Sequence, residues 1–522
     1  MRVEKTLLIL LLLTTFFKGI VWAAFVPIWH FPDEQAHFAQ VQYYTELKKN
    51  IGAGNDLSLE VYESERLLGT LRDEQGINKF TYRPEYRIPY TQSNLGIHEE
   101  EIANLPEEAR TSFVKKEAAR YPPLFYVVSS VGYLLGFPFN LFVRVFLTRI
   151  ISVLMAVATV WITFLLAKAV FAKNTLLAIS TATLVSFQPM YTFLSSGVNN
   201  DNLLILLSTL LLWLMVDAMR KGMTAKHTIG MGITLGLGIA TKQLIYPFIP
   251  LPLLVVGYDA LKRKGRSRES LKQVFLLVAF GIIFGGGIFA GRWMQSGNIP
   301  GWPRVNPESP MAHLSFITYL SEKIPQLYRE TLPWYWGVFK WLGVVLPLSA
   351  LRAIKVVLVL SGIGLVQYTA GKIHKRRRET RDWQLLFLAF SSIWFAAWLL
   401  VWDYTLIRSI GFSHGIQGRN FFPNIAPHML LVVFGLWQLT TKYQRHIIKA
   451  LVLAIVVLNF IALKTVLGSY YDLLPVRTFI IQASQYKPWF FKGGGLMLWS
   501  VLYLTMVVNF VYSFLKLDRR KP

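Results

Sequence analysis

The residues best suited to chemistry in this sequence lie in the stretch Trp29-His-Phe-Pro-Asp-Glu-Gln-Ala-His-Phe38, directly after the first apolar segment. Pro32 suits the first turn of a helix, where its missing N–H is harmless, and the helix dipole favours acids in that turn. Asp33 and His37 are four residues apart and share one helix face, whereas Glu34 points away from it. These three are the candidate catalytic residues, with Asp33 expected as the general base and Glu34 held structurally. The alternative is that these residues only form the acidic first turn of a helix and take no part in a reaction.

A second polar group lies at Val198-Asn-Asn-Asp-Asn202, which the predicted topology places at the same membrane surface as Asp33. Asp201 and Asn200 are candidates for a supporting acid and its neighbour. The alternative is a polar turn whose side chains cap the next helix. Asp33, His37 and Asp201 could together hold a divalent cation, because they supply oxygen and nitrogen ligands. The sequence leaves the need for a metal open and implies no other cofactor.

Four basic residues near this surface are candidates for binding a phosphate group: Lys242, Arg419, Arg144 and Arg149. A Lys at membrane depth costs about 2.5–3.5 kcal/mol on insertion scales, so such residues usually face a polar cavity. The planar fork of an Arg donates two hydrogen bonds to a phosphate at once. We expect Arg419 and Lys242 to converge near Asp33, although they are far away in sequence. Snorkelling toward lipid headgroups is the alternative for each of the four.

The elements that must position these residues are transmembrane helices. Of the 522 residues, 53% are hydrophobic and 16% are charged, against about 25% charged in soluble domains. There is no cysteine, which excludes disulfides and thiolate chemistry. Because a bilayer core needs about 20 apolar residues of helix, we predict an all-α polytopic membrane protein with about twelve spans. These are expected at 6–28, 141–167, 175–195, 203–219, 228–241, 243–258, 273–293, 350–370, 384–402, 422–440, 446–467 and 494–515.

The distribution of charge predicts the orientation in the membrane. The formal net charge is +25, but residues 30–121 hold 16 of the 29 acidic side chains and 11 of the 54 basic ones. The basic clusters elsewhere fall into alternate loops, which indicates that these loops are cytoplasmic. We therefore expect both termini in the cytoplasm and the site on the extracytoplasmic face of the plasma membrane. No basic patch combines with stacking aromatic residues on a soluble face, which argues against a nucleic-acid partner.

This topology divides the chain into five parts. Within the loop domain we expect extended chain at 82–90, a short helix at 99–116 and an amphipathic helix at the interface after residue 121. An aromatic belt is the expected role of 333–341, with a sugar-stacking platform or lipid groove as the alternative. The five parts are a retained first transmembrane helix (1–29), an extracytoplasmic loop domain (30–140), helices two to seven (141–295), an outer aromatic-rich loop (296–349) and helices eight to twelve (350–522).

The acidic motif and three later motifs resemble known membrane families. A membrane-exit Asp-Glu in the first outer loop is the hallmark of the GT-C glycosyltransferases. Protein O-mannosyltransferases carry a similar Asp-Glu-x-His-Phe stretch, and dolichol-phosphate-mannose-dependent mannosyltransferases a His-Pro-Asp-Glu; this chain has one residue more in each spacing. It is more similar to a bacterial membrane family, domain-of-unknown-function family 2142. That similarity is carried by Pro32-Asp-Glu-x-x-His-Phe38, Val198-Asn-Asn-Asp201, Trp336-Gly-Val-Phe-Lys-Trp-Leu342 and Gln417-Gly-Arg-Asn-Phe-Phe-Pro423.

The resemblance implies a GT-C-like bundle and a membrane glycosyltransferase. Such an enzyme moves a sugar from a polyprenyl-phosphate-linked donor to a glycan, lipid or protein acceptor on the outer face. The resemblance to GT-C enzymes implies that the loop carboxylate, here Asp33, acts as general base on the acceptor hydroxyl or holds a metal. Aminoarabinose transferases carry an Asp and a phosphate-contacting Lys similar to Asp201 and Lys242. A nucleotide-sugar donor is not expected, because no Gly-rich phosphate loop is present. The alternatives are a transporter or flippase of lipid-linked glycans and a non-catalytic envelope-polymer assembly protein.

Overall fold

Helices make up almost all of the regular structure, as predicted for an all-α polytopic membrane protein. The only sheets in the described part of the chain are two antiparallel pairs, β1 (Leu57–Ser58) with β2 (Phe113–Lys115) and β3 (Val338–Phe339) with β4 (Val344–Val345). The computed structural model describes residues 2–48, 54–72, 96–117, 121–262, 267–375, 379–413 and 415–517. The expected extended chain at 82–90 lies outside these residues.

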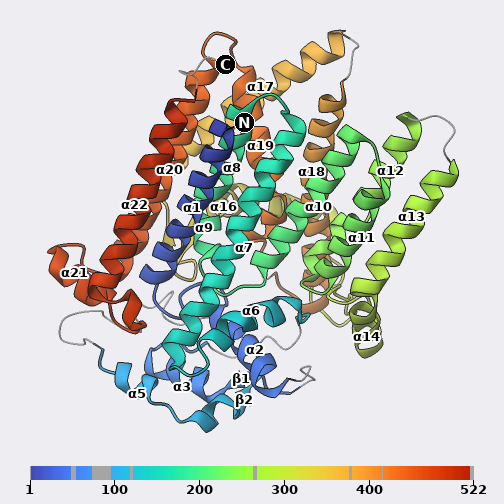
Figure 1. The fold of residues 1–522 in the computed structure, drawn as a ribbon. Helices are drawn as coiled ribbons and strands as arrows, with labels where there is room; N and C mark the ends of the chain where they lie inside the picture. The colour runs from blue at the N-terminus through green and yellow to red at the C-terminus, as the bar shows by residue number, and fades with distance from the viewer. Residues whose placement is uncertain are drawn as a thin grey trace.

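Ten helices within the described residues are long and apolar enough to cross a membrane, and they form the bundle in Figure 1. Many of them expose large apolar side chains, which is the surface expected where lipid is the solvent. The spanning elements are α1 (Arg2–Phe25), α7 (Leu141–Val170), α10 (Asp201–Lys221), η4–α12 (Gln243–Phe248, Leu251–Lys262), α13–α14 (Ser267–Gly281, Gly287–Ser296), α17 (Leu348–Lys375), α18 (Thr380–Ile410), η7–α19 (Gly418–Asn424, Ile425–Gln438), α20 (Gln444–Tyr470) and α22 (Gly493–Leu515).

The predicted count of twelve spans is not confirmed, because two of the expected segments are helical but short. Segment 175–195 is divided into α8 (Thr175–Phe187) and α9 (Pro189–Ser195), since Pro189 has no N–H to continue the helix. Lys18 of α1 donates to the carbonyl oxygen of Ser186 at this break. Segment 228–241 is α11 (Ala225–Ile239), whose 15 residues extend about 22 Å, short of a core about 30 Å thick.

Glycines let several helices approach one another closely. A Cβ on Gly236 of α11 would lie 2.7 Å from the Cβ of Phe284, and one on Gly364 of α17 would lie 1.8 Å from the carbonyl oxygen of Gly435 of α19. Small residues at such crossings allow backbone-to-backbone packing in membranes. Close packing of α11 matters for the site, because the chain leaves this helix directly before Lys242.

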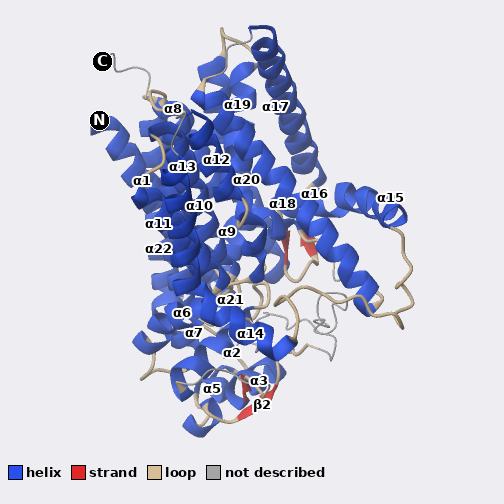
Figure 2. Cartoon of the chain, turned by 90° about the vertical axis from the view of Figure 1, so that its right-hand side faces the viewer, coloured by secondary structure: helices blue, strands red, loops and turns tan. Residues whose placement is uncertain are grey.

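The loop domain lies at the end of the bundle opposite to the two termini (Figures 1 and 2). Its helices are α2 (Glu34–Leu47), α3 (Leu59–Leu67) and α5 (Glu99–Ala103), followed by the turn η3 (Glu107–Arg110). The helix expected over 99–116 therefore ends at Ala103, because Pro106 interrupts it and β2 follows. Helix α6 (Leu124–Leu135) runs across the ends of the bundle helices (Figure 1) and exposes Val131 and Leu134, as expected for an interfacial helix.

Several short elements connect the spanning helices along the chain. They are α15 (Phe316–Gln326), η6 (Leu327–Thr331), α16 (Leu332–Trp336), α21 (Val476–Ala483) and η8 (Trp489–Phe491). In Figure 2, α15 projects from the side of the bundle. A buried polar group attaches it to α18, where Asp403 accepts from Tyr319 (3.0 Å) and Lys323 (3.1 Å).

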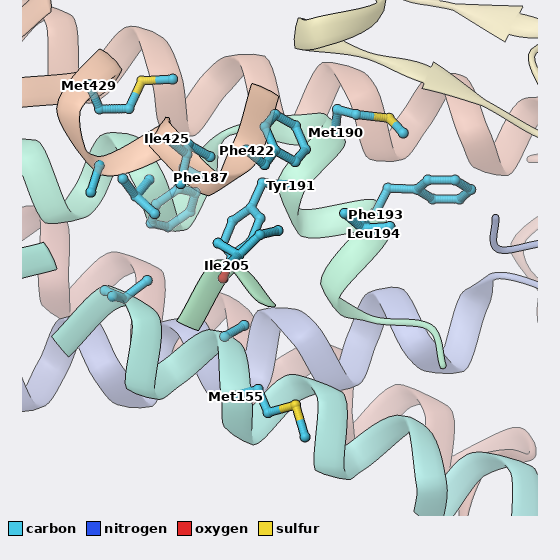
Figure 3. Packing of buried hydrophobic residues seen from close by; sticks show 14 of the residues in the cluster. Met155, Phe187, Met190, Tyr191, Phe193, Leu194, Ile205, Phe422, Ile425 and Met429 are labelled. Carbon is cyan, nitrogen blue, oxygen red and sulfur yellow. The ribbon is translucent and has the colours of Figure 1, made fainter. Parts of the chain in front are cut away.

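The buried core meets the candidate site at α9. Figure 3 shows Tyr191 and Phe193 of α9 packed among apolar side chains. The ring of Tyr191 lies 5.9 Å from that of Phe422 in η7, and the ring of Phe193 lies 4.9 Å from that of Phe31. The broken helix therefore contacts both the segment that carries Arg419 and the segment that leads into Asp33.

Candidate active site

Asp33 lies immediately before helix α2 and does not cap it. Helix α2 begins at Glu34, so Pro32 and Asp33 precede the first turn in which they were expected. The backbone of Asp33 is left-handed, with φ 55°, and its side chain makes no capping hydrogen bond. Asp tolerates this conformation better than most residues, although it is strained. The carboxylate remains 34% exposed and lines a cavity, where a ligand can reach it.

Glu34 is fully buried and holds three segments together. Its carboxylate accepts from Arg149 at 2.8 and 2.6 Å and from the backbone N–H groups of Trp29 and Val198 at 3.1 and 3.2 Å. Arg149, also fully buried, donates in addition to the carbonyl oxygens of Ala23, Val26 and Pro27 at the end of α1. This pair connects α1, α7 and the loop before α10. It does not line the cavity.

The cavity has a volume of about 600 Å³ and is lined by residues of the loop domain and of the helix ends that face it. Five of the predicted site residues line it: Asp33, His37, Asp201, Lys242 and Arg419. Nη2 of Arg419 lies 2.8 Å from Oδ2 of Asp33, and Nζ of Lys242 lies 2.5 Å from Oδ1 of Asp201. The expected convergence of Arg419 and Lys242 near Asp33 is thus observed.

Two further charged residues, Arg72 and Glu117, line the cavity and were missed by the sequence analysis. Nη1 of Arg72 lies 3.4 Å from Oδ1 of Asp33, and the same guanidinium pairs with Glu117. The ring of Trp341 lies 5.7 Å from the guanidinium carbon. Neither residue belongs to a motif, so only their general position in the acidic loop could have drawn attention to them.

The wall of the cavity nearest to α18 is aromatic. Trp302 and Trp398 contact each other edge to face at 5.4 Å, and Trp402 donates to the carbonyl oxygen of Gly301 at 2.9 Å. All three line the cavity, together with the apolar side chains of Leu399 and Leu406. The stretch 333–341 is not part of this lining. The cavity is therefore amphipathic, because both charged side chains and aromatic or apolar ones line it.

Besides Glu34 and Arg149, two more predicted site residues do not line the cavity. Arg144 is fully buried, and its Nη1 donates to Glu60 at 3.0 Å and to Tyr133 at 2.8 Å. Asn200 is buried directly before α10 and makes no capping bond. Neither lines the cavity, so the side chain of Arg144 holds the loop domain on α7 instead.

The electrostatic surroundings determine the charge state of Asp33 and His37. Burial disfavours the charged form of Asp33, but the guanidinium groups of Arg419 and Arg72 outweigh burial and hold the pKa of this carboxyl well below its usual range. Burial lowers the pKa of His37 to about 3. Its Nδ1 lies 3.0 Å from the hydroxyl of Tyr126. Near neutral pH, Asp33 is therefore ionised and His37 is neutral.

The donor set does not fit a divalent cation in this arrangement. Within the described residues, no group of three or more His, Asp or Glu side chains could hold a metal ion. The oxygens of Asp33 and Asp201 contact cationic side chains, Arg419 and Lys242, at hydrogen-bond distance. An ionised carboxylate such as that of Asp33 can accept a proton, and cations such as those of Arg419 and Lys242 can bind an anion.

Among solved structures, the chain is similar to two proteins at low sequence identity. ArnT from Cupriavidus metallidurans, bound to undecaprenyl phosphate, gives a TM-score of 0.46 at 14% identity, over 98% of this chain and 76% of that chain. Oligosaccharyltransferase AglB from Archaeoglobus fulgidus, in complex with an inhibitory peptide and a dolichol-phosphate, gives 0.40 at 12% identity, over 82% and 55%. With TM-scores below 0.5, these superpositions carry no argument about the reaction.

The sequence itself relates the chain to one family. No curated protein matches it significantly. A family model described as a predicted membrane protein, DUF2142, matches residues 16–429. This range includes the acidic motif, the polar loop before α10 and the segment that carries Arg419. The chain belongs to the DUF2142 family of membrane proteins.

Proposed function

We propose that this protein is a membrane glycosyltransferase that moves a sugar from a polyprenyl-phosphate-linked donor to an acceptor hydroxyl on the outer face. One observation carries the proposal: an accessible carboxylate, Asp33, shares a cavity of about 600 Å³ with the cations Arg419 and Lys242 and with an aromatic, apolar wall. The sequence resemblance to GT-C glycosyltransferases points to the same reaction.

The reaction needs a base and a place for an anionic leaving group. Asp33 accepts the proton of the acceptor hydroxyl while the hydroxyl oxygen forms a bond to the anomeric carbon. The bond between that carbon and the phosphate oxygen breaks, and the polyprenyl phosphate leaves with the electron pair. Arg419 and Lys242 stabilise its negative charge. A positioned general base contributes about 10²–10⁴-fold to such a step.

The shape and lining of the cavity support a lipid donor. A phosphate at Arg419 and Lys242 leaves the apolar side, formed by Trp398, Trp402 and Leu406, for the polyprenyl chain. Helix α18, which carries these three residues, also exposes Ile393 and Val401 on its surface. A chain bound along α18 can therefore continue into the lipid. A soluble nucleotide sugar would leave this apolar surface without a partner.

The position of the cavity supports transfer on the extracytoplasmic side. Both termini lie at one end of the bundle, and the loop domain that forms the floor of the cavity lies at the other (Figure 1). The basic loops predict that the end with the termini is cytoplasmic. The site would then face the compartment in which lipid-linked sugars, rather than nucleotide sugars, supply the donor.

The experiment is sugar transfer in proteoliposomes that contain polyprenyl-phosphate-linked sugars and a mixture of candidate acceptors. Asp33→Asn keeps the shape of the side chain and removes the charge, so we expect turnover to fall by on the order of 10² or more. Glu99→Gln is the matched control, since Glu99 pairs with Lys492 at the same end of the molecule outside this cavity. Transfer by Asp33→Asn at the wild-type rate would contradict the assignment.

A further inference from the structure

Every carboxylate that lines the cavity already contacts a cation. Asp33 contacts Arg419 and Arg72, Asp201 contacts Lys242, and Glu117 contacts Arg72. The charges of these three acids and three cations add up to zero, and His37 is neutral near pH 7. An anionic ligand therefore meets cations that are already paired. It binds most strongly if it takes one of these cations from its carboxylate.

Arg419 is the cation best placed for such an exchange. It holds Asp33 through Nη2 alone, at 2.8 Å, while Nε donates to Gln417 at 2.8 Å. Its buried Nη1 has no hydrogen-bond partner among the described residues. A phosphate offers several acceptor oxygens and binds a guanidinium through two parallel hydrogen bonds. It can therefore satisfy Nη1 as well as Nη2, which one oxygen of Asp33 does not.

Arg72 is fixed on the other side of Asp33. Its guanidinium pairs with Glu117 and packs against the ring of Trp341, and its side chain is 7% exposed. It touches Oδ1 of Asp33, whereas Arg419 touches Oδ2. Loss of Arg419 would therefore leave Asp33 with one remaining guanidinium contact.

We propose that the donor phosphate takes Arg419 from Asp33, and that Arg72 then holds the released carboxylate in position for proton transfer. The proposal rests on the function proposed above and adds an order of events to it. Before the donor binds, two guanidinium groups make Asp33 a weak base. After the exchange one of them faces the phosphate, so the carboxylate attracts a proton more strongly. Arg72 acts through Asp33 and is a positioning residue, so the acceptor is activated only when a donor is present.

Binding of a non-transferable ligand tests the exchange. The probe is polyprenyl phosphate without a sugar, titrated into the protein in nanodiscs. Asp33→Asn removes the competing carboxylate, so the variant should bind the probe more tightly than the wild type, by on the order of tenfold, equivalent to about 1.4 kcal/mol. Glu99→Gln, the control outside the cavity, should bind like the wild type.

The outcomes separate the exchange from the proposed function. Binding to the wild type with no gain in Asp33→Asn would overturn the exchange and leave a lipid-phosphate site. No binding to the wild type would overturn both. Thermal melting of each variant shows whether it is folded, and should Asp33→Asn fail to fold, Asp33→Ser provides the same comparison.

A second variant tests the role of Arg72. Arg72→Gln should lower kcat by on the order of tenfold or more while the affinity for polyprenyl phosphate stays within about twofold of the wild type. Arg419→Gln should weaken that affinity instead. A loss of affinity in Arg72→Gln as large as in Arg419→Gln would show that Arg72 binds the phosphate, and would overturn its positioning role. Arg72→Lys should restore part of kcat.

Discussion

Neighbouring acids, Asp33 and Glu34, have opposite surroundings. Glu34 is fully buried and accepts four hydrogen bonds, two of them from Arg149. Asp33 is one residue earlier, outside the helix, and its carboxylate reaches the cavity. The left-handed backbone at Asp33 turns the two side chains to different sides of the chain. One acid therefore supports the structure, while the other is available for a ligand.

Glu34→Gln should destabilise the protein much more than it changes catalysis. Removing one partner of a buried ion pair leaves a buried charge without compensation, which costs about 3–5 kcal/mol. We expect a large fall in melting temperature in detergent, with turnover per folded molecule close to normal. Glu63→Gln is the control, because Glu63 pairs with Arg66 at the surface, where such pairs contribute about 0–1 kcal/mol. Equal melting temperatures for the two variants would contradict the structural role of Glu34.

At the scale of single elements, α3 carries a buried acid beneath the site. Glu65 is 1% exposed, and burial, opposed by Arg72 and reinforced by Glu117, raises the pKa of its carboxyl to about 8. The folded state therefore holds a proton that the unfolded state loses near pH 4.5. The free energy of unfolding therefore falls as the pH rises from 4.5 to about 8, because the unfolded state binds fewer protons than the folded state in this range.

The pH dependence of melting tests this effect. Glu65→Gln resembles the protonated carboxyl at every pH, so its melting temperature should fall less than that of the wild type between about pH 5 and about pH 9. At the acid end the two proteins should melt at similar temperatures. Parallel curves would show that Glu65 does not titrate in this range in the folded protein.

The close crossing of α17 and α19 depends on a glycine in each helix, Gly364 and Gly435. A Cβ on Gly364 would lie 1.8 Å from the carbonyl oxygen of Gly435, whereas one on Gly362 would meet nothing within 4 Å. Gly364→Ala should therefore force the helices apart and cost about 1–3 kcal/mol or more. Gly362→Ala, two residues away on the same helix, should be neutral or slightly stabilising. Similar melting temperatures for both variants would contradict this close approach.

At the scale of the whole molecule, the termini and the loop domain lie at opposite ends of the bundle (Figures 1 and 2). The positive-inside pattern assigns the end with the termini to the cytoplasm. The chain contains no cysteine, so single-cysteine variants can be labelled without background. Lys226, Lys442 and Glu107 are exposed positions for this purpose.

Labelling of intact cells with a membrane-impermeant maleimide should modify Glu107→Cys. Lys226→Cys and Lys442→Cys should react only after the membrane is permeabilised, because they lie in loops predicted to be cytoplasmic. Labelling of either lysine position in intact cells would show that the predicted orientation is reversed and that the cavity faces the cytoplasm.

The sequence by itself indicated that lipid surrounds the protein, and it predicted most of the long helices and part of the polar lining of the candidate site. Apolar runs of about 20 residues and the distribution of charge are local properties, so they can be read without tertiary structure. The four-residue spacing of Asp33 and His37 is local too. The cost of a cation at membrane depth pointed to Lys242, and together with the motif around Arg419 it predicted their convergence on Asp33.

Only the tertiary structure decided how the charges are paired and where the aromatic wall lies. Arg149 and Arg144 were phosphate-binding candidates like Arg419, but each pairs with a buried acid, Glu34 and Glu60 respectively. The second cation on Asp33, Arg72, comes from a loop without a motif. The wall is built from Trp302 and α18 rather than from 333–341. Such pairings depend on packing between segments that are between 39 and 386 residues apart, and no pattern within a single helix or loop contains that information.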